Sequence, residues 1–599
     1  MIVSFILFVM FAIFASTVAI QAAEESKPYN SAIKKIDILI KEEMKRNKIQ
    51  GLSVALVDEE GIFWSRGYGY QDIKNKVEAS PRTLYRTASV TKPFTATAIM
   101  LLVDRGLVNL DTPVKEYIPE FAINSLFKQK SEITVRDLLN HHSGIKRDHY
   151  KGISGDNPPS LDFLVEELKD DYLALPPKSR YKYSNINYAL LGKIIENVSG
   201  KSYSQFMQEE IFQPLGMSDT FIGLNEENKD KIARAYEIKG LLFKKPKEIE
   251  QYANRDIPAG SMISSVEDTA KFITMLLNKG MINSDNEFLS SDLLEQMFVV
   301  QYPDNQLDDD PYGLGWKVNK VNIPYTTMNI RHGGTLVGFS TLVAAAPEEK
   351  LGIVIYYNTN HIFSRHYIVN EALKLLAKSK DDKIDKSKDR PEKQRNREQI
   401  IALDDIQPHD FQGRYVGIGD LPLVLDLKVN KGEMSLNLMN QSLSLIPVND
   451  YRHEVIKEIL FFDIDVGRFM GVDNTFFEFY QSQDGVIYPR LILKYEDLEM
   501  KIFFTKIQPY NLPQSLAKLE GKYIPTEDSL PYIYQNSFAE FELKIKDGWL
   551  EMNTTWEGND LSFLLKPIDE TKLVTYGSGE ILIIKDDLIY YSGLRFKKK

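Results

Sequence analysis

Ser89 and Lys92 stand three residues apart in the stretch YRTASVTKPFTATAIMLLVDRG. A serine hydroxyl is a poor nucleophile until a base takes its proton, and a lysine amine can be that base when burial or nearby positive charge lowers its pKa. Residues three apart share one face of a helix, and Pro93 suits a first helical turn, where free N–H groups can also stabilise an oxyanion. The same spacing recurs at five other serines at least, so alone it favours a plainer interpretation, in which Lys92 is a solvated charge near a helix start.

Tyr183 and Asn185 form a second pair of chemical interest, in the stretch RYKYSNINYALLG ahead of a helical pattern. A tyrosine near a lysine can act as a base and later as an acid toward a leaving group, and an amide side chain beside it can orient a substrate carbonyl. The alternative is structural, with Asn185 capping the helix and Tyr183 packed on the core. Taken alone, the pair favours that alternative.

His332 precedes two glycines in the stretch NIRHGGTLVGFSTLV. Glycines at a strand edge let a ligand come close and expose a backbone N–H, which we assign to Thr335. From this position His332 could donate to a substrate carboxylate or carbonyl. A glycine bulge with an incidental histidine explains the same residues equally well.

The elements around these motifs predict an α+β domain. Strand patterns occur near its start, at 52–58 and 62–70, and near its end, at 340–347 and 351–358. Between them, apolar residues at helical spacing predict amphipathic helices that stop at glycine. These are residues 95–108, with the stop at Gly106, and residues 186–200 and 266–280. Strands at both ends with helices between them indicate that the two ends of the domain meet in one sheet.

Together and in this order, the three motifs resemble the penicillin-binding protein and class C β-lactamase superfamily of serine hydrolases, in a His-x-Gly variant. Further matching stretches are ITVRDLLNHHSGI, IFQPLGMSDT, PAGSMISSVEDTAKF and YGLGW, and the resemblance covers roughly residues 31–376. It implies the β-lactamase or DD-peptidase type of fold, an antiparallel sheet flanked by helices. It also implies that no metal or organic cofactor is needed.

The resemblance further implies catalytic roles. Ser89 would be the acylated nucleophile, and Lys92 would lower the barrier to its deprotonation. Tyr183 would shuttle the proton. Asn185 would hold the substrate amide or ester.

The third motif would contribute the edge strand of the family's cleft. His332 and Gly334 would line that edge, and the N–H of Thr335 would form the oxyanion hole together with that of Ser89. Efficient β-lactamases of the superfamily have Lys where this chain has His332. Because a histidine is mostly neutral at pH 7, we expect weak β-lactam hydrolysis at most and a site more like those of esterases and D-amino-acid peptidases.

Residues 1–23 predict a cleaved export signal, because residues 2–20 carry no charge and small residues follow at Ala22 and Ala23. The alternative is an uncleaved membrane anchor, since about 19 apolar residues just span a bilayer. We therefore expect a secreted or periplasmic protein, with membrane anchoring through this segment as the alternative. The chain has no cysteine, which excludes disulfides and thiol catalysis. A net charge of −11 argues against nucleic acid as a partner.

The chain of 599 residues is too long for one ordinary domain. We predict a hydrolase domain over 28–378, a charged linker over 379–400, and β-rich modules over 401–510 and 511–599. The modules look repeated, because FQGRYVG and LEGKYIP each precede alternating strands around a hairpin turn. The repeat is faint, and a single larger β domain is the alternative.

These observations predict an exported serine hydrolase that forms an acyl-enzyme on Ser89. Its substrate would be a small peptide, amide or ester, cell-wall fragments included, as for DD-peptidases, carboxypeptidases, D-aminopeptidases or esterases. The alternative is a protein without catalysis that uses the same scaffold to bind a ligand. A missing catalytic residue would favour that alternative, and none is missing from the three motifs.

Overall fold

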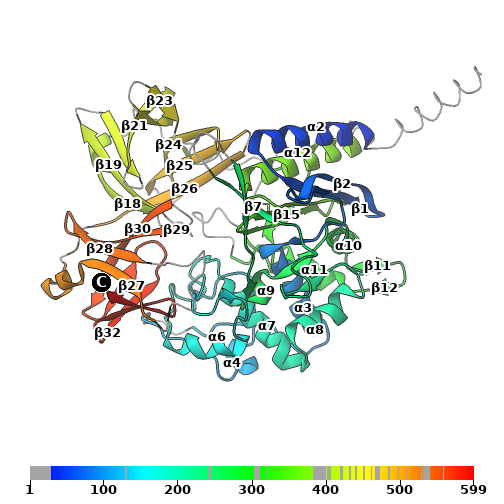
Figure 1. The fold of residues 1–599 in the computed structure, drawn as a ribbon, viewed down its shortest axis with the longest axis horizontal. Helices are drawn as coiled ribbons and strands as arrows, with labels where there is room; N and C mark the ends of the chain where they lie inside the picture. The colour runs from blue at the N-terminus through cyan, green and yellow to red at the C-terminus, as the bar shows by residue number, and fades with distance from the viewer. Residues whose placement is uncertain are drawn as a thin grey trace, which may run out of the picture.

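The chain folds into an α+β domain followed by two β barrels, as the computed structural model shows (Figure 1). The structure describes residues 29–381 apart from 129–130, 240–244, 303–310 and 320–321, and residues 399–599 apart from short stretches, the longest being 401–406, 418–422, 466–471 and 530–539. The predicted signal and most of the predicted linker lie outside the described residues. The predicted fold class, an α+β domain followed by all-β modules, is confirmed.

One antiparallel sheet of seven strands organises the α+β domain, in the order β13-β14-β15-β16-β1-β2-β3. Its strands are β1 Gly51–Asp58, β2 Gly61–Asp72, β3 Val77–Glu78, β13 Lys317–Val318, β14 Ile330–Leu336, β15 Phe339–Ala346 and β16 Leu351–Tyr357. The first long strand pairs with the last one, with Leu52 opposite Tyr357. The two ends of the domain therefore meet in one sheet, as predicted.

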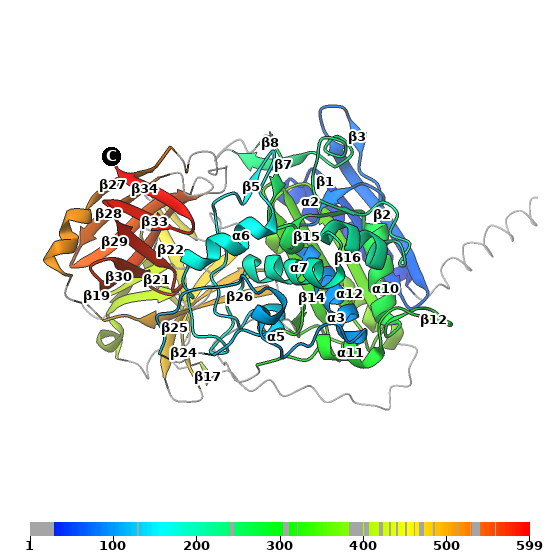
Figure 2. The ribbon, with the colours of Figure 1, turned by 90° about the horizontal axis from the view of Figure 1, so that it is seen from below.

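Helices cover both faces of this sheet, as Figures 1 and 2 show. They are α2 Asn30–Asn47, α3 Thr91–Asp104, α4 Val114–Tyr117, α5 Val135–Leu139, α6 Leu161–Glu167, α7 Asn185–Ser199, α8 Tyr203–Met207, α9 Ile257–Gly260, α10 Val266–Leu277, α11 Ser291–Met297 and α12 Ile362–Asp381. Strand β1 is buried on both sides: Val54 and Leu56 join the core beneath α2 and α12, and Ala55 and Val57 join the core with α10. Alternate residues of a strand face opposite sides, so both cores need apolar residues here.

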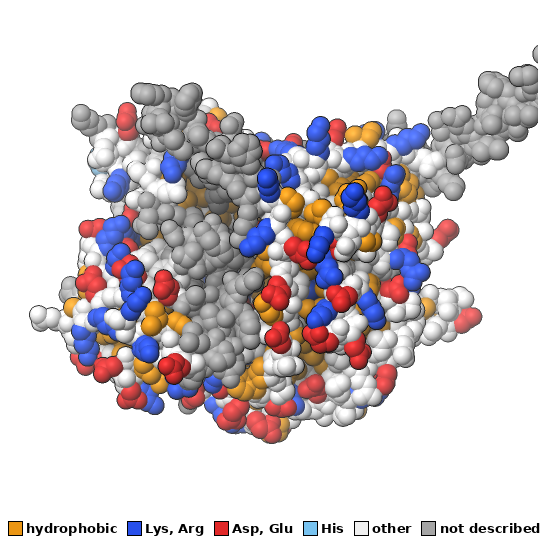
Figure 3. All heavy atoms as spheres, viewed as in Figure 1, with side chains coloured by type: hydrophobic (Ala, Val, Ile, Leu, Met, Phe, Trp, Pro, Cys, Tyr) orange, Lys and Arg blue, Asp and Glu red, His pale blue; other side chains and the backbone are white. Residues whose placement is uncertain are grey.

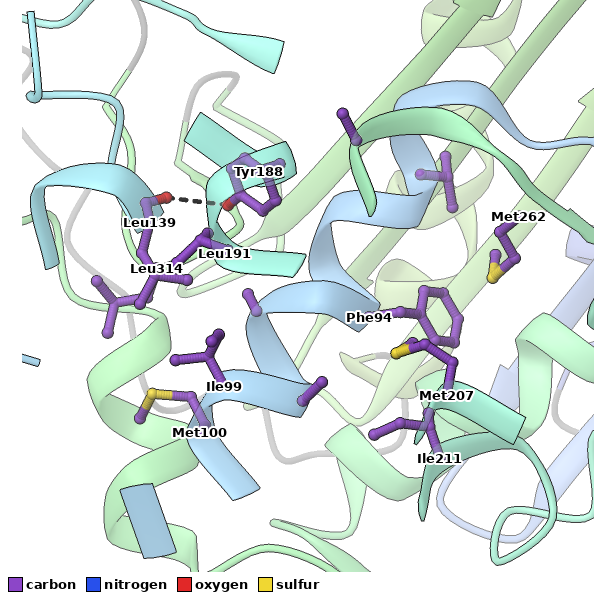
Figure 4. Close-up of a cluster of buried hydrophobic side chains, with 14 of the residues drawn as sticks. Phe94, Ile99, Met100, Leu139, Tyr188, Leu191, Met207, Ile211, Met262 and Leu314 are labelled. Carbon is purple, nitrogen blue, oxygen red and sulfur yellow. Dashed lines mark hydrogen bonds between the residues drawn. The ribbon is translucent and has the colours of Figure 1, made fainter. Parts of the chain in front are cut away.

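Helix α3 runs through the middle of the larger core. In the close-up of Figure 4, Phe94, Ile99 and Met100 of this helix lie among apolar side chains from several other elements. Tyr188 of α7 donates to the carbonyl oxygen of Leu139 at 2.9 Å, which satisfies its buried hydroxyl. A helix packed on all sides is a rigid base for residues at its amino-terminal end.

Short strands complete the domain. They are β4 Tyr85–Arg86, β5 Ser154–Gly155, β6 Phe221–Ile222, β7 Ala235–Lys239, β8 Lys245–Ile249, β9 Ala253–Asn254, β10 Met262–Ser264, β11 Met281–Asn283 and β12 Asn286–Glu287. Strand β10 pairs with both β4 and β6, which fixes the chain just before α3.

The first barrel is built from a ten-stranded sheet in which β22 also pairs with β24, so that the sheet closes on itself. Its strands are β17 Gln399–Ile400, β18 Gly413–Gly417, β19 Val424–Asn430, β20 Glu433–Leu438, β21 Gln441–Asn449, β22 Arg452–Ile459, β23 Phe462–Asp465, β24 Asn474–Gln481, β25 Ile487–Tyr495 and β26 Leu498–Lys506. Closure removes the exposed edges that an open sheet would leave.

The second barrel is closed as well, through the pairing of β27 with β34. Its strands are β27 Gly521–Pro525, β28 Phe541–Lys546, β29 Trp549–Trp556, β30 Asn559–Asp569, β31 Lys572–Thr575, β32 Ile581–Lys585, β33 Leu588–Tyr591 and β34 Leu594–Lys598. Each barrel has its own apolar core, and a small cluster that includes Val416 and Trp549 joins them.

The two similar sequence segments, FQGRYVG and LEGKYIP, adopt the same local structure at the start of each barrel. The Tyr415 hydroxyl donates to the carbonyl of Phe411 at 2.6 Å, and the Tyr523 hydroxyl donates to that of Leu519 at 2.8 Å. In the first barrel β18 pairs with the last strand, β26, with Tyr415 opposite Lys506. In the second barrel β27 pairs with the last strand, β34, with Tyr523 opposite Lys598. The tail therefore forms two separate closed barrels rather than a single larger β domain.

The surface is evenly mixed in charge where Figure 3 displays it. Over the α+β domain, lysine and arginine side chains are interspersed with aspartate and glutamate on this face. Within the described part of the chain, no helix combines the length and apolar character that crossing a bilayer requires.

Candidate active site

Ser89 lies on a tight turn immediately before α3. Ala88, the residue before it, has a positive φ of 50°, an uncommon conformation for a residue with a side chain. A short 3-10 turn, Ala88–Val90, then leads into the helix. Ser89 stays partly exposed, while Lys92 in the first turn of α3 has no exposed surface. The alternative in which Lys92 is a solvated charge is therefore wrong.

Three oxygen atoms surround the Lys92 amine. Its Nζ lies 3.1 Å from Ser89 Oγ, and it donates to Asn185 Oδ1 at 2.7 Å and to the Ala259 carbonyl oxygen at 2.7 Å. A neutral amine has two hydrogens and one lone pair. When the hydrogens go to Asn185 and Ala259, the lone pair is left for the hydroxyl of Ser89.

Burial holds the pKa of Lys92 well below its usual range, and the positive charge of Arg147 lowers this pKa further. The carboxylates of Asp148 and Asp256 act in the opposite direction. The net effect favours the neutral amine. A neutral lysine within hydrogen-bond reach of a serine has the properties of a general base.

Tyr183 is the second group at the nucleophile. Its hydroxyl donates to Ser89 Oγ at 2.8 Å, and Lys92 Nζ lies 4.8 Å from the centroid of its ring. Arg147 lies on the same ring, with 5.3 Å between its guanidinium carbon and the ring centroid. The serine, lysine and tyrosine thus form one hydrogen-bonded cluster with a second cation beside it.

Asn185 stands at the start of α7 and is held at both ends of its amide. The side chain of Ser184, which accepts from the Asn187 N–H, caps this helix, so Asn185 is not the cap. Asn185 Oδ1 faces Lys92, and Asn185 Nδ2 donates to Asp148 Oδ1 at 2.7 Å. The structure therefore places Asn185 in the cluster, as expected, with its amide orientation fixed by Asp148.

Strand β14 packs against the turn that carries Ser89. A side chain at Gly334 would collide with the Thr87 carbonyl oxygen, because a Cβ there would lie 2.1 Å from it. Thr335, the next residue, is exposed, and its hydroxyl accepts from Arg365 of α12 at 3.2 Å. Gly334 and Thr335 thus lie beside the nucleophile turn, where the sequence placed them.

His332 has a different setting from the one expected. Its side chain is only 1% exposed, its Nδ1 donates to the Gly333 carbonyl oxygen at 2.9 Å, and its Nε2 accepts from the Tyr312 hydroxyl at 2.9 Å. Burial together with the charge of Lys92 lowers the pKa of His332 well below its usual value, which favours a neutral ring. Because the Gly333 carbonyl can only accept, Nδ1 carries the proton of that neutral ring and Nε2 is the acceptor. Both ring nitrogens are occupied by protein groups, so the ring supports the strand from within.

Arg147 and Asp148 also belong to the site but were not predicted from the sequence; one residue separates them from the matched stretch ITVRDLLNHHSGI. A charged pair in a loop carries no spacing signal, because its function depends on what the loop is folded against. His141 contacts the site as well, which the sequence did not predict: its ring lies 4.5 Å from that of Tyr183, and its Nδ1 accepts from the Ser184 N–H at 3.1 Å. Among the described residues, no group of histidine and acidic side chains is arranged to hold a metal ion.

Comparisons with known proteins agree with this geometry. The Beta-lactamase family model matches residues 36–378. Protein flp of Staphylococcus aureus (strain MW2) is 32% identical over 339 residues, which make up 55% of this chain and 64% of that protein. The match thus spans less than two thirds of that relative's length.

Two solved structures share the fold. The octameric penicillin-binding protein homologue from Pyrococcus abyssi has a TM-score of 0.50 and 23% identity, and the alignment covers 79% of this chain and 100% of that one. The D-amino acid amidase from Ochrobactrum anthropi SV3 has a TM-score of 0.50 and 24% identity, over 59% of this chain and 100% of that one. Because the family model covers more than half of the residues, this chain belongs to the Beta-lactamase family, whose members are serine hydrolases.

Proposed function

We propose that this protein is an exported serine hydrolase that forms an acyl-enzyme on Ser89 and cleaves a small peptide, amide or ester. One observation carries the proposal. Ser89 Oγ lies 3.1 Å from a buried amine whose pKa is lowered and 2.8 Å from a tyrosine hydroxyl. A serine with a base and a proton shuttle in contact is an activated nucleophile.

The chemistry follows from these contacts. Ser89 Oγ attacks the substrate carbonyl carbon, and its proton passes to Lys92 Nζ. A proton then reaches the leaving amine or alcohol through Tyr183, and the C–N or C–O bond breaks. Water then attacks the acyl carbon and loses a proton to Lys92 Nζ. The bond between that carbon and Ser89 Oγ breaks, the proton passes to Ser89 Oγ, and the acid is released. The N–H groups of Ser89 and Thr335 would stabilise the oxyanion in both halves.

His332 and the proteins that share the fold support an amide, peptide or ester substrate over a β-lactam. A neutral, buried histidine supplies no cation at the position where efficient β-lactamases have lysine, so β-lactam turnover should be slow. A D-amino acid amidase shares the fold, which supports amides and peptides, cell-wall fragments among them, as candidates. Export rests on residues 1–23, and amino-terminal sequencing of the mature protein would test it.

The test is intact-protein mass spectrometry after brief exposure to benzylpenicillin and, separately, to p-nitrophenyl acetate, with released product followed in parallel. We expect an adduct on Ser89 or ester turnover in the wild type. Ser89→Ala should lower turnover by about 10⁴-fold or more. Ser179→Ala is the matched control, because Ser179 begins another Ser-x-x-Lys match, is exposed, and donates to the Pro176 carbonyl oxygen.

The outcomes separate the alternatives. A lasting penicillin adduct only where Ser89 is present indicates a peptidase-like site, and ester turnover without that adduct indicates an esterase-like or amidase-like site. Turnover that survives in Ser89→Ala would refute the assignment. Absence of both adduct and turnover in the wild type would favour the ligand-binding alternative.

A further inference from the structure

The segment 146–150 joins the active-site cluster to the second barrel. On its inner side it is tied to the start of α7. The Ser184 hydroxyl donates to the Lys146 carbonyl oxygen at 2.7 Å, and the Asn185 N–H donates to that of Arg147 at 2.8 Å. Asp148 Oδ1 adds the contact to the Asn185 amide described above. The position of this segment therefore determines how Asn185 meets Lys92.

On its outer side the segment contacts the turn between β33 and β34. The Tyr150 N–H donates to the Ser592 carbonyl oxygen at 2.9 Å, and the Ser592 hydroxyl lies 3.3 Å from the Asp148 carbonyl oxygen, which it donates to. The Tyr150 ring packs on the core of the second barrel, 6.3 Å from that of Tyr591. The barrel thus holds the backbone of the residues that hold Asn185.

The contact with the barrel is tightly packed and leaves no room for a side chain at Gly593. A Cβ at Gly593 would lie 2.1 Å from His149 Nε2. His149 cannot easily move, because its Nδ1 lies 2.8 Å from Asp171 Oδ2 and its carbonyl oxygen accepts from Arg255 at 2.9 Å. A larger residue at Gly593 must therefore displace either the segment or the barrel turn.

We infer that the second barrel is part of the active site: its β33–β34 turn fixes the segment 146–150, and through it Asp148 acts as a positioning residue that keeps the Asn185 amide oriented toward Lys92. The inference rests on the proposed function of Ser89. If Asp148 is lost or displaced, the Asn185 amide can turn and present its NH₂ group to the amine. Lys92 would then lose one acceptor, and its lone pair would no longer be directed at Ser89.

The first test compares two glycines of the same barrel. Gly593 and Gly548 both lie in hairpin turns with positive φ, 81° and 80°, so alanine strains both backbones alike. Gly593 abuts His149, whereas a Cβ at Gly548 would meet nothing within 4 Å. We expect Gly593→Ala to lower kcat for p-nitrophenyl acetate about tenfold or more, since small displacements of catalytic groups are costly. Gly548→Ala should match the wild type.

The second test asks whether the two residues act along one route. Asp148→Ala should also lower kcat about tenfold, and Asp148→Asn should restore most of it, because asparagine keeps an oxygen that accepts from Asn185. The double variant Gly593→Ala with Asp148→Ala should be little worse than either single variant. Equal losses in both glycine variants, or additive losses in the double variant, would overturn the inference.

A third measurement does not depend on turnover. The backbone N–H groups of Asn185 and Ile186 both donate to the Arg147 carbonyl oxygen. Hydrogen exchange in a peptide covering 183–190 should be faster in Gly593→Ala than in Gly548→Ala. If the wild type hydrolyses nothing but this difference appears, the proposed function fails and the link to the barrel stands. If the two variants exchange alike, the link itself is refuted.

Discussion

The last hairpins of the two barrels are built alike and dock on different parts of the α+β domain. In each, a tyrosine ends the first strand and a residue with positive φ follows, Glu496 at 50° and Ser592 at 48°. In the first barrel, the Tyr495 hydroxyl donates to Glu43 Oε2 of α2 at 2.6 Å, and Glu496 pairs with Arg46. In the second barrel, the Ser592 hydroxyl donates to the carbonyl oxygen of Asp148, whose side chain accepts from Asn185 of the active-site cluster.

The chemistry of the two contacts differs as much as their location. The first hairpin uses long charged side chains, and Arg46 remains 39% exposed, so this contact tolerates small shifts. The second uses backbone hydrogen bonds and a glycine without free space, which fix positions more closely. Two barrels of similar build thus make one contact suited to attachment and another suited to a site that needs accurate geometry.

The largest effect we expect in this comparison comes from the site itself. Tyr183→Phe removes the hydroxyl that donates to Ser89 Oγ and should lower kcat/KM by about 10²- to 10⁴-fold, the usual range for general acid–base groups. Steady-state kinetics with p-nitrophenyl acetate measures it, and thermal unfolding checks the fold. Activity near that of the wild type would mean that Lys92 acts without the tyrosine. Variants at either hairpin are to be judged against this loss.

Much of the α+β domain was predictable because its signals are local. The predicted helix stop at Gly106 is confirmed by its φ of 69°, and the pattern of 186–200 ends at Gly200 with the same angle. The barrels were predictable as strands, but their closure depends on pairings such as β22 with β24 and β27 with β34, which no short stretch encodes.

The residues of the site likewise fall into those that local motifs predicted and those that depend on contacts between distant parts of the chain. Ser89, Lys92, Tyr183 and Asn185 were found from motifs, and the structure brings them together. Asp148 could not be predicted, because its role depends on contacts that only the folded chain creates. Its side chain accepts from Asn185, and its backbone accepts from Ser592, 444 positions away. The catalytic role of all of them stays a prediction until turnover is measured.

A smaller effect should appear in the pH dependence of the rate when the charge of Arg147, on the segment that contacts the second barrel, is removed. Because Lys92 must be neutral to act as a base, the rate should rise with pH through its lowered pKa. Arg147→Gln removes a positive charge that lowers this pKa, so the pKa should rise and the ascending limb should move to higher pH. The rate along the ascending limb should fall several-fold, and the rates should converge at high pH. The measurement is kcat/KM against pH.

The contact between α2 and the first barrel supplies the control for that experiment. Arg46→Gln also removes a half-exposed arginine at a barrel contact, but its partners are Glu43, Asp473 and Glu496 rather than groups of the site. Its pH profile should coincide with that of the wild type. An equal shift in both variants would show that the change reflects the charge of the whole molecule instead of the position of Arg147.

The smallest effect should come from the hairpin of the first barrel. Tyr495→Phe removes the hydrogen bond to Glu43 while keeping the ring that packs against Phe363 and Tyr367 of α12. The loss should be about 1–2 kcal/mol of stability, visible as a lower midpoint of thermal unfolding. Because this hairpin docks on α2, kcat/KM should not change. A fall in kcat/KM comparable to that of Gly593→Ala would mean that both barrels tune the site, and the distinction between attachment and positioning would have to be abandoned.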